Sequence, residues 1–200
     1  VTGSTFSGNG YNRIRVASGT FVDGVALALQ SGQEAYQFEG DMTVAAGRAL
    51  TLAPNMLTLW PGSAELKVQG HLYAVGTPTQ PITFTSTTNT GPNQWSGLVF
   101  DGGTGELRHV VVRYGGNANS VLATNLGANI TARNVPAGGL LVESSQVRDG
   151  NKGLNNVFYG LYATGSRVTV SDTLFTGNGY QTADYALYVT GSSITVTSNV

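Results

Sequence analysis

Short segments of alternating apolar and polar residues run through most of the chain. Clear examples are Ile82–Thr85, Val168–Ser171 and Ile194–Thr197. Alternation with a period of two is typical of strands that bury one face. The runs between turns are too short for helices, so strand–helix–strand folds are unlikely to organise the chain. The pattern therefore predicts an all-β protein.

A second, longer pattern repeats along the sequence. An apolar residue, four intervening residues and another apolar residue recur, with Gly or Asn after each frame that continues. The frames are Val1–Phe6, Leu107–Val112, Val142–Val147, Val170–Phe175 and, with three intervening residues, Val196–Val200. The last three begin 28 and 26 residues apart, and FSGNGY at 6–11 returns as FTGNGY at 175–180. A fixed period of this length predicts stacked coils of short strands, with Gly and Asn at the corners.

The middle of the chain carries more specific motifs. They read GDMTVAAGRALTLAP (40–54), LKVQGHLYAVG (66–76), TPTQPITFTS (77–86), QWSGLVF (94–100) and LRHVVVRYGG (107–116). In this order they resemble secreted bacterial right-handed parallel β-helix repeat proteins with the pectate-lyase-like fold, of the surface adhesin and stalk type. The resemblance is close over 36–116. It departs at Pro54-Asn55, where the family has Pro-Gly, although Asn also tolerates the left-handed turn.

The repeat and the resemblance together predict one single-stranded right-handed parallel β-helix of roughly eight coils, continuous over 1–200. Residues 1–35 are expected to end a preceding block of coils and form a junction, and 36–200 to form a second block. An insertion is expected near 117–138, because the frames at Leu107 and Val142 are 35 residues apart. The apolar run Val25–Leu29 needs burial, either as a continuing strand or as a short capping helix. Because the chain starts in the middle of its repeat, we interpret it as part of a longer stack.

Composition narrows the classes of function. Only 10% of residues are charged and the net charge is −1, which argues against nucleic-acid binding and against a polybasic membrane patch. There is no cysteine, and no apolar run approaches the ~18 residues of a membrane span. The low charge fits a β-rich surface of Thr, Ser and Asn, or a surface adapted to bind sugar or ice. Thr-x-Thr pairs do not recur at a fixed period, which disfavours ice binding.

Catalytic and metal-binding motifs are missing from the sequence. The acidic residues are scattered, with no Asp-Asp or Asp-x-Asp pair, and the only histidines are His71 and His109. His109 is expected on a strand as an ordinary structural residue. Polysaccharide hydrolases need paired carboxylates, and lyases usually need calcium held by several carboxylates. We therefore predict no catalytic residue, no metal and no cofactor.

Five residues are candidates for contact with a glycan: Trp95, Tyr180, Tyr185, Arg113 and Arg148. Exposed aromatic rings stack on sugars, and arginines on one face form a groove for anionic glycans. Each candidate has a structural alternative. Trp95 lies in the family's Trp-x-Gly phrase and could pack at a corner, the tyrosines could form a stacked aromatic column, and the arginines could lie on a solvated strand face.

The expected function is that of a non-catalytic segment of an exported bacterial cell-surface protein, acting as a rigid stalk or adhesive surface. The alternative is a polysaccharide lyase or hydrolase, or a fragment of one, since some members of the resembled group act on carbohydrates. The expected partners are a polysaccharide or host-surface glycan and further β-helix coils of the same parent chain, without nucleic acid or membrane insertion. The expected location is extracellular, at the bacterial surface.

Overall fold

The protein is built from three parallel β-sheets. The structure, a computed structural model, describes residues 3–117, 119–153 and 156–198. Within these ranges there is no helix, and all strand pairings between the named strands are parallel. Each sheet has seven strands. The prediction of an all-β protein is confirmed.

The strands are distributed among the sheets as follows. Sheet 1 contains β1 (Arg13–Val16), β4 (Ala35–Phe38), β7 (Leu57–Trp60), β10 (Ile82–Ser86), β13 (Val110–Arg113), β16 (Gln146–Arg148) and β19 (Leu174–Thr176). Sheet 2 contains β2 (Gly19–Phe21), β5 (Met42–Val44), β8 (Glu65–Val68), β11 (Gly97–Asp101), β14 (Leu126–Arg133), β17 (Val157–Thr164) and β20 (Tyr185–Thr190). Sheet 3 contains β3 (Val25–Leu27), β6 (Ala49–Leu52), β9 (His71–Val75), β12 (Thr104–Arg108), β15 (Leu140–Glu143), β18 (Arg167–Ser171) and β21 (Ser193–Thr197).

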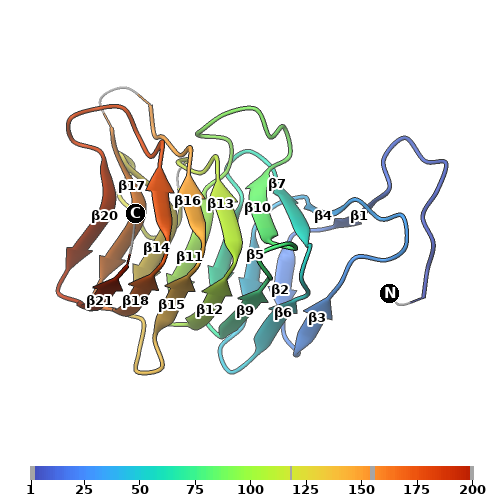
Figure 1. Ribbon diagram of the computed structural model, residues 1–200, viewed down its shortest axis with the longest axis horizontal. Helices are drawn as coiled ribbons and strands as arrows, with labels where there is room; N and C mark the ends of the chain where they lie inside the picture. Colours follow the sequence, from blue (N-terminus) through green and yellow to red (C-terminus); the bar gives the residue numbers. More distant parts are fainter. Residues whose placement is uncertain (1–2, 118, 154–155, 199–200) are drawn as a thin grey trace.

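The chain visits the three sheets in turn and then repeats. Each strand pairs with the strands three places before and after it, so successive triplets stack side by side along the molecule (Figure 1). This arrangement is consistent with the predicted solenoid. Seven triplets are present, against the roughly eight coils expected. Val1 and Val200, the outer ends of the first and last sequence frames, lie outside the described residues.

Apolar columns run through the interior from coil to coil. In sheet 2 the strand register joins one such column of residues, which is buried except at its last member: Met42, Leu66, Leu98, Ile130, Leu161 and Leu187. The equivalent column in sheet 3 includes Leu72, Leu140 and Val168, with Gly105 between the first two. Gly105 lies against the ring of Phe100, where a Cβ would be only 2.5 Å from a ring carbon. These columns explain the alternation that is visible in the sequence.

The corner between sheet 3 and sheet 1 falls inside the repeated sequence frame. One residue with positive φ makes the turn in successive coils: His109 (48°), Ser144 (49°) and Asp172 (49°). The prediction that His109 lies on a strand is wrong, because it separates β12 from β13. Hydroxyl groups complete the turn. Ser145 Oγ accepts a hydrogen bond from Val110 N (3.1 Å) and donates to Glu143 O (2.7 Å).

Two segments that the sequence pattern left open, Val25–Leu29 and 117–138, each contain a strand of the stack. Val25–Leu27 is β3 in sheet 3, so this apolar run continues the stack and is no capping helix. The stretch near 117–138 contains the whole of β14, with one connection before it and one after it. Both segments thus follow the same three-sheet order as the rest of the chain.

Candidate functional site

The long connections of the later coils lie at one edge of the stack, where sheet 1 leads into sheet 2. They join β10 to β11, β13 to β14, β16 to β17 and β19 to β20, and Figure 1 shows them projecting beyond the strand ends. The other two corners of these coils are mostly short. Insertions on one side of a repeat protein commonly build its binding face. We refer to this region as the loop edge.

Two asparagine side chains, of which one is fully buried, fix the start of these connections. Asn129 is fully buried, and its Oδ1 accepts a hydrogen bond from Gly115 N at 2.9 Å. Its Nδ2 donates to Arg148 O at 3.1 Å and to Asn178 Oδ1 at 2.9 Å. Asn178 Nδ2 in turn donates to Val147 O at 2.6 Å. Two asparagines therefore tie together the ends of β13, β16 and β19.

A cleft of about 330 Å³ opens between these connections. Its lining combines two aromatic rings, a carboxylate, an amide and several small residues. The lining residues are Thr90, Gly91, Pro92, Tyr114, Asp149, Gly150, Asn151, Gly177 and Tyr180. Tyr180 is 69% exposed, so its ring is available to a ligand. The cleft has the mixture of ring surface and polar groups that sugar-sized ligands require.

Two of the predicted arginines lie beside this cleft. Arg113 and Arg148 occupy the same register on β13 and β16, so their side chains are neighbours on adjacent coils. Arg148 forms an ion pair with Asp149. Arg113 places its guanidinium 5.1 Å from the centre of the Tyr114 ring, and no carboxylate pairs with it in the described part of the chain.

Four tyrosines form a cluster next to the loop edge, on β17 and β20 of sheet 2. The register pairs Tyr159 with Tyr185 and Tyr162 with Tyr188. Ring centres are 6.1 Å apart in the first pair and 5.3 Å in the second, and both pairs are nearly parallel. Tyr159 also lies 5.0 Å from Tyr188. We call these four residues the tyrosine cluster.

The side chains of the tyrosine cluster differ in how much of their surface is exposed. Tyr159 is 6% exposed, whereas Tyr185 is 51% and Tyr188 is 38% exposed. Burial, followed by the neighbouring tyrosines and Asp184, raises the pKa of Tyr159 above its ordinary value of 10.0. Tyr159 therefore remains neutral at physiological pH. The outer pair, Tyr185 and Tyr188, offers apolar ring faces with hydroxyl groups at their rim.

Trp95 is a core residue, which corrects the expectation of a ligand contact. It is fully buried and stacks on Trp60 at 5.8 Å, and Trp60 stacks on Phe38 at 4.1 Å. Its indole Nε1 donates a hydrogen bond to Arg113 O at 2.7 Å. Trp95 thus supports the loop edge from beneath. The structural alternative considered for it, packing at a corner, is the arrangement found.

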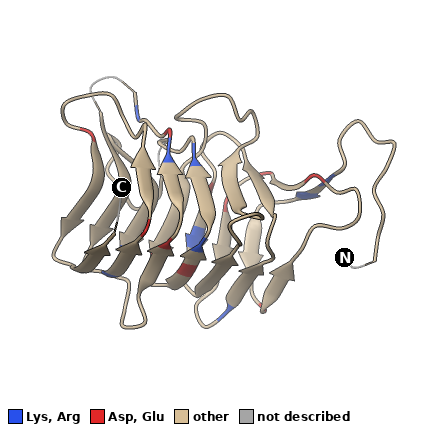
Figure 2. Cartoon of the chain, viewed as in Figure 1, with Lys and Arg blue, Asp and Glu red and all other residues tan. Residues whose placement is uncertain are grey.

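Several of the other charged groups form ion pairs with one another. Figure 2 shows charge thinly spread over the strands, with both signs adjacent in the middle of the stack. Arg108 pairs with Glu106 and Glu143, and Arg133 pairs with Asp101 through two contacts of 2.9 and 3.0 Å. Among the described residues, no three His, Asp or Glu side chains gather closely enough to hold a metal ion.

His71 belongs to a structural contact on sheet 3. Its Nδ1 is 2.6 Å from Thr104 Oγ1, and its ring centre is 3.9 Å from that of Tyr73. Burial lowers the pKa of His71 below 6.5, and the negative charge of Glu106 offsets part of this shift. The imidazole is therefore largely neutral at pH 7.

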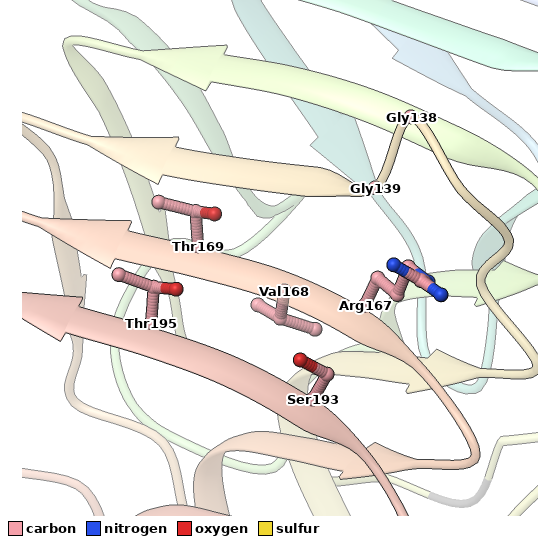
Figure 3. Close-up of a pocket in the computed structure, with 7 residues that line it drawn as sticks. All are labelled: Gly138, Gly139, Arg167, Val168, Thr169, Ser193 and Thr195. Carbon is pink, nitrogen blue, oxygen red and sulfur yellow. The ribbon is translucent and has the colours of Figure 1, made fainter.

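A second hollow, also of about 330 Å³, lies on the outer face of sheet 3 (Figure 3). Thr169 and Thr195 lie side by side on paired strands, and Arg167 extends near the turn at Gly138 and Gly139. No aromatic side chain lines this hollow. It therefore offers no ring on which a sugar could stack, and the cleft at the loop edge is the stronger candidate.

Of the five predicted binding residues, the structure thus places Tyr180 in the lining of the cleft. Arg113 and Arg148 lie at the ends of β13 and β16, next to the lining residues Tyr114 and Asp149. Tyr185 lies at the start of β20, in the tyrosine cluster, and Trp95 lies beneath the edge. Sequence analysis missed Asn129, which follows no repeated frame. Its hydrogen-bond partners are 14 to 49 residues away in the sequence, so no local signal identifies it.

Comparisons of the chain with protein-family models, curated proteins and solved structures each returned no match. A search of the described residues for a helix of the length and hydrophobicity needed to cross a membrane also found none.

Proposed function

We propose that this chain is a glycan-binding, non-catalytic segment of an exported bacterial surface protein. The tyrosine cluster is the observation that carries the proposal. Two adjacent coils present paired rings, and the outer pair, Tyr185 and Tyr188, is exposed. A soluble protein rarely leaves a contiguous aromatic patch exposed unless something binds it.

The chemistry of the cluster suits a carbohydrate. A sugar ring presents C–H groups on its faces and hydroxyl groups at its edge. Tyrosine presents an apolar, electron-rich face to the first and a phenolic hydroxyl to the second. Parallel strands repeat at about 4.8 Å, so rings on neighbouring coils form a row along the stack that can follow an extended polymer.

The scaffold in this proposal is a right-handed parallel β-helix. Parallel strands joined by a crossover are right-handed in almost all proteins, which supports this hand. A rod built in this way holds its loop edge in a fixed position, as a stalk or adhesive surface requires. The sparse surface charge and the abundance of hydroxyl side chains support an extracellular location.

The test is retention by immobilised or gel-embedded polysaccharides of plant, algal and bacterial origin. We expect the unaltered chain to be retained by at least one polymer, without release of new reducing ends. The double variant Tyr185→Ala/Tyr188→Ala should bind roughly tenfold more weakly, from about 0.5–1.5 kcal/mol for each ring contact. Tyr73→Ala is the matched control, because Tyr73 is 41% exposed but lies on sheet 3.

Three outcomes contradict the proposal. The first is that no polymer retains the chain. The second is that polymers retain the double variant and Tyr73→Ala as well as they retain the unaltered chain, so that the tyrosine cluster has no role in glycan binding. Cleavage of any polymer would replace the proposal by the enzymatic alternative.

A further inference from the structure

The cleft at the loop edge contains a buried polar group without a partner. Asn151 is only 3% exposed, and its Oδ1 accepts a hydrogen bond from Gly153 N. Its Nδ2 has no hydrogen-bond partner among the described residues. An unsatisfied buried donor costs about 1–3 kcal/mol, so proteins seldom retain one without a reason. A ligand oxygen that reaches this amide would recover that free energy.

An acceptor lies two residues away on the same cleft wall. The carboxylate of Asp149 also lines the cleft, and it accepts hydrogen bonds but donates none when ionised. Asp149 uses Oδ2 for its ion pair with Arg148, and no side-chain hydrogen bond occupies Oδ1 among the described residues. A residue with a free donor (Asn151) and a residue with a free acceptor (Asp149) thus both line one small cleft, together with Tyr114 and Tyr180.

We propose that this cleft is a subsite for one neutral sugar ring that presents two neighbouring hydroxyl groups. One hydroxyl oxygen accepts a hydrogen bond from Asn151 Nδ2, and the other hydroxyl donates to Asp149 Oδ1. Tyr180 covers one face of the ring. The inference rests on the proposed function and extends it by naming the class of sugar.

Charge decides between a neutral and an acidic sugar. Among the described residues, Asp149 is the only charged one that lines the cleft. The nearest guanidinium groups do not line the cleft: that of Arg148 pairs with Asp149, and that of Arg113 lies 5.1 Å from the centre of the Tyr114 ring. A uronate or sulfate ester in the cleft would therefore meet a carboxylate of the same sign. This argument departs from the expectation of an arginine groove for anionic glycans.

The backbone holds both polar residues in place before any ligand arrives. Asp149 N donates to Thr176 O at 3.0 Å, and Asn151 N donates to Gly115 O at 3.2 Å. Gly177 has a φ of 61°, and a Cβ there would lie 2.6 Å from Asp149 Oδ1. Only glycine therefore leaves that oxygen free, and a rigid subsite loses less entropy on binding.

The experiment titrates the whole 200-residue chain with methyl glycosides of glucose, galactose and mannose, and with glucuronate as the acidic counterpart. Nuclear magnetic resonance follows the side-chain amide of Asn151 directly. We expect at least one neutral glycoside to shift this amide, with glucuronate weaker. Asp149→Asn should weaken that binding by about tenfold to a hundredfold, because it removes a charged acceptor.

The matched control is Asp172→Asn. Asp172 also has a positive φ, 49° against 52° for Asp149, but it lies at the corner between sheets 3 and 1, away from the cleft. Asn tolerates this backbone conformation, so both variants should remain folded. The control should bind as the unaltered chain does.

Three results would overturn the inference. One is tighter binding of glucuronate than of every neutral glycoside. Another is equal binding by Asp149→Asn and Asp172→Asn. In the third, polymers are retained through Tyr185 and Tyr188 but no glycoside shifts the Asn151 amide; the subsite is then wrong while the proposed function stands. If no polymer is retained either, both fail.

Discussion

Two corners of the same coils differ in how they turn. Between sheets 3 and 1, one left-handed residue reverses the chain in successive coils, and a buried hydroxyl such as that of Ser145 bonds to the coil beside it. Between sheets 1 and 2, the connections of the later coils are long and varied, and side-chain amides of Asn129 and Asn178 hold their bases. On either side of both kinds of corner, the strands pair in register with those of the neighbouring coils.

The difference shows where this scaffold tolerates variation. After β12, β15 and β18 the corner is tight, because the next coil lies about 4.8 Å away and the backbone groups find their partners there. The same corner between β9 and β10 spans residues 76–81, so its length is a property of these three coils. At the loop edge the partners come from side chains beneath, so the chain above is free to form a cleft. Stability and binding should therefore be separable by position, and the following variants test this.

The largest effect on stability is expected at the base of the loop edge. Trp95→Ala removes a fully buried ring that stacks on Trp60, and should lower the free energy of unfolding by about 3–5 kcal/mol. Denaturant titration measures it. Tyr180→Ala, at the rim, should change the same quantity by no more than about 0.5 kcal/mol while weakening glycan binding. Similar losses of stability in both variants would refute the division between base and rim.

A smaller effect is expected at the tight corner. Ser145→Ala leaves Val110 N–H buried without its acceptor and should cost about 1–3 kcal/mol of unfolding free energy. Glycan retention should not change, since the corner lies between other sheets. Ser193→Ala, an exposed serine on β21, serves as the control and should be nearly neutral. A loss of binding in Ser145→Ala without loss of stability would contradict the comparison.

Sequence patterns predicted the repeated strands because alternation is a local property. Ile82–Thr85 and Val168–Ser171 lie in strands β10 and β18, as expected. The corner at His109 was not predicted, because glycine and asparagine are the usual signals for a left-handed residue, and here His, Ser and Asp take that conformation. Stacking against the neighbouring coil, which is not local, imposes it.

The candidate site was predictable only where its signals are local in the sequence. Tyr180 and Arg148 border on turn signals and were recognised as candidates for exposed positions. Trp95 also lies between polar residues, in the connection from β10 to β11, yet it is fully buried and stacks on Trp60. The partnership of Asp149 with Asn151 and Tyr114 depends on which coils are adjacent, and no single segment of the sequence contains that information.

The smallest effect expected concerns the tyrosine cluster at alkaline pH. The pKa of Tyr159 is raised in the folded protein, so as pH rises through 10.0 the unfolded chain loses the phenolic proton first. The free energy of unfolding should then fall with increasing pH, while it is unaffected by this group below that range. Tyr159→Phe keeps the ring but removes the proton, and should reduce the slope measured by denaturant titration above pH 10. An unchanged slope would mean that the titration of Tyr159 does not contribute to the loss of stability at high pH.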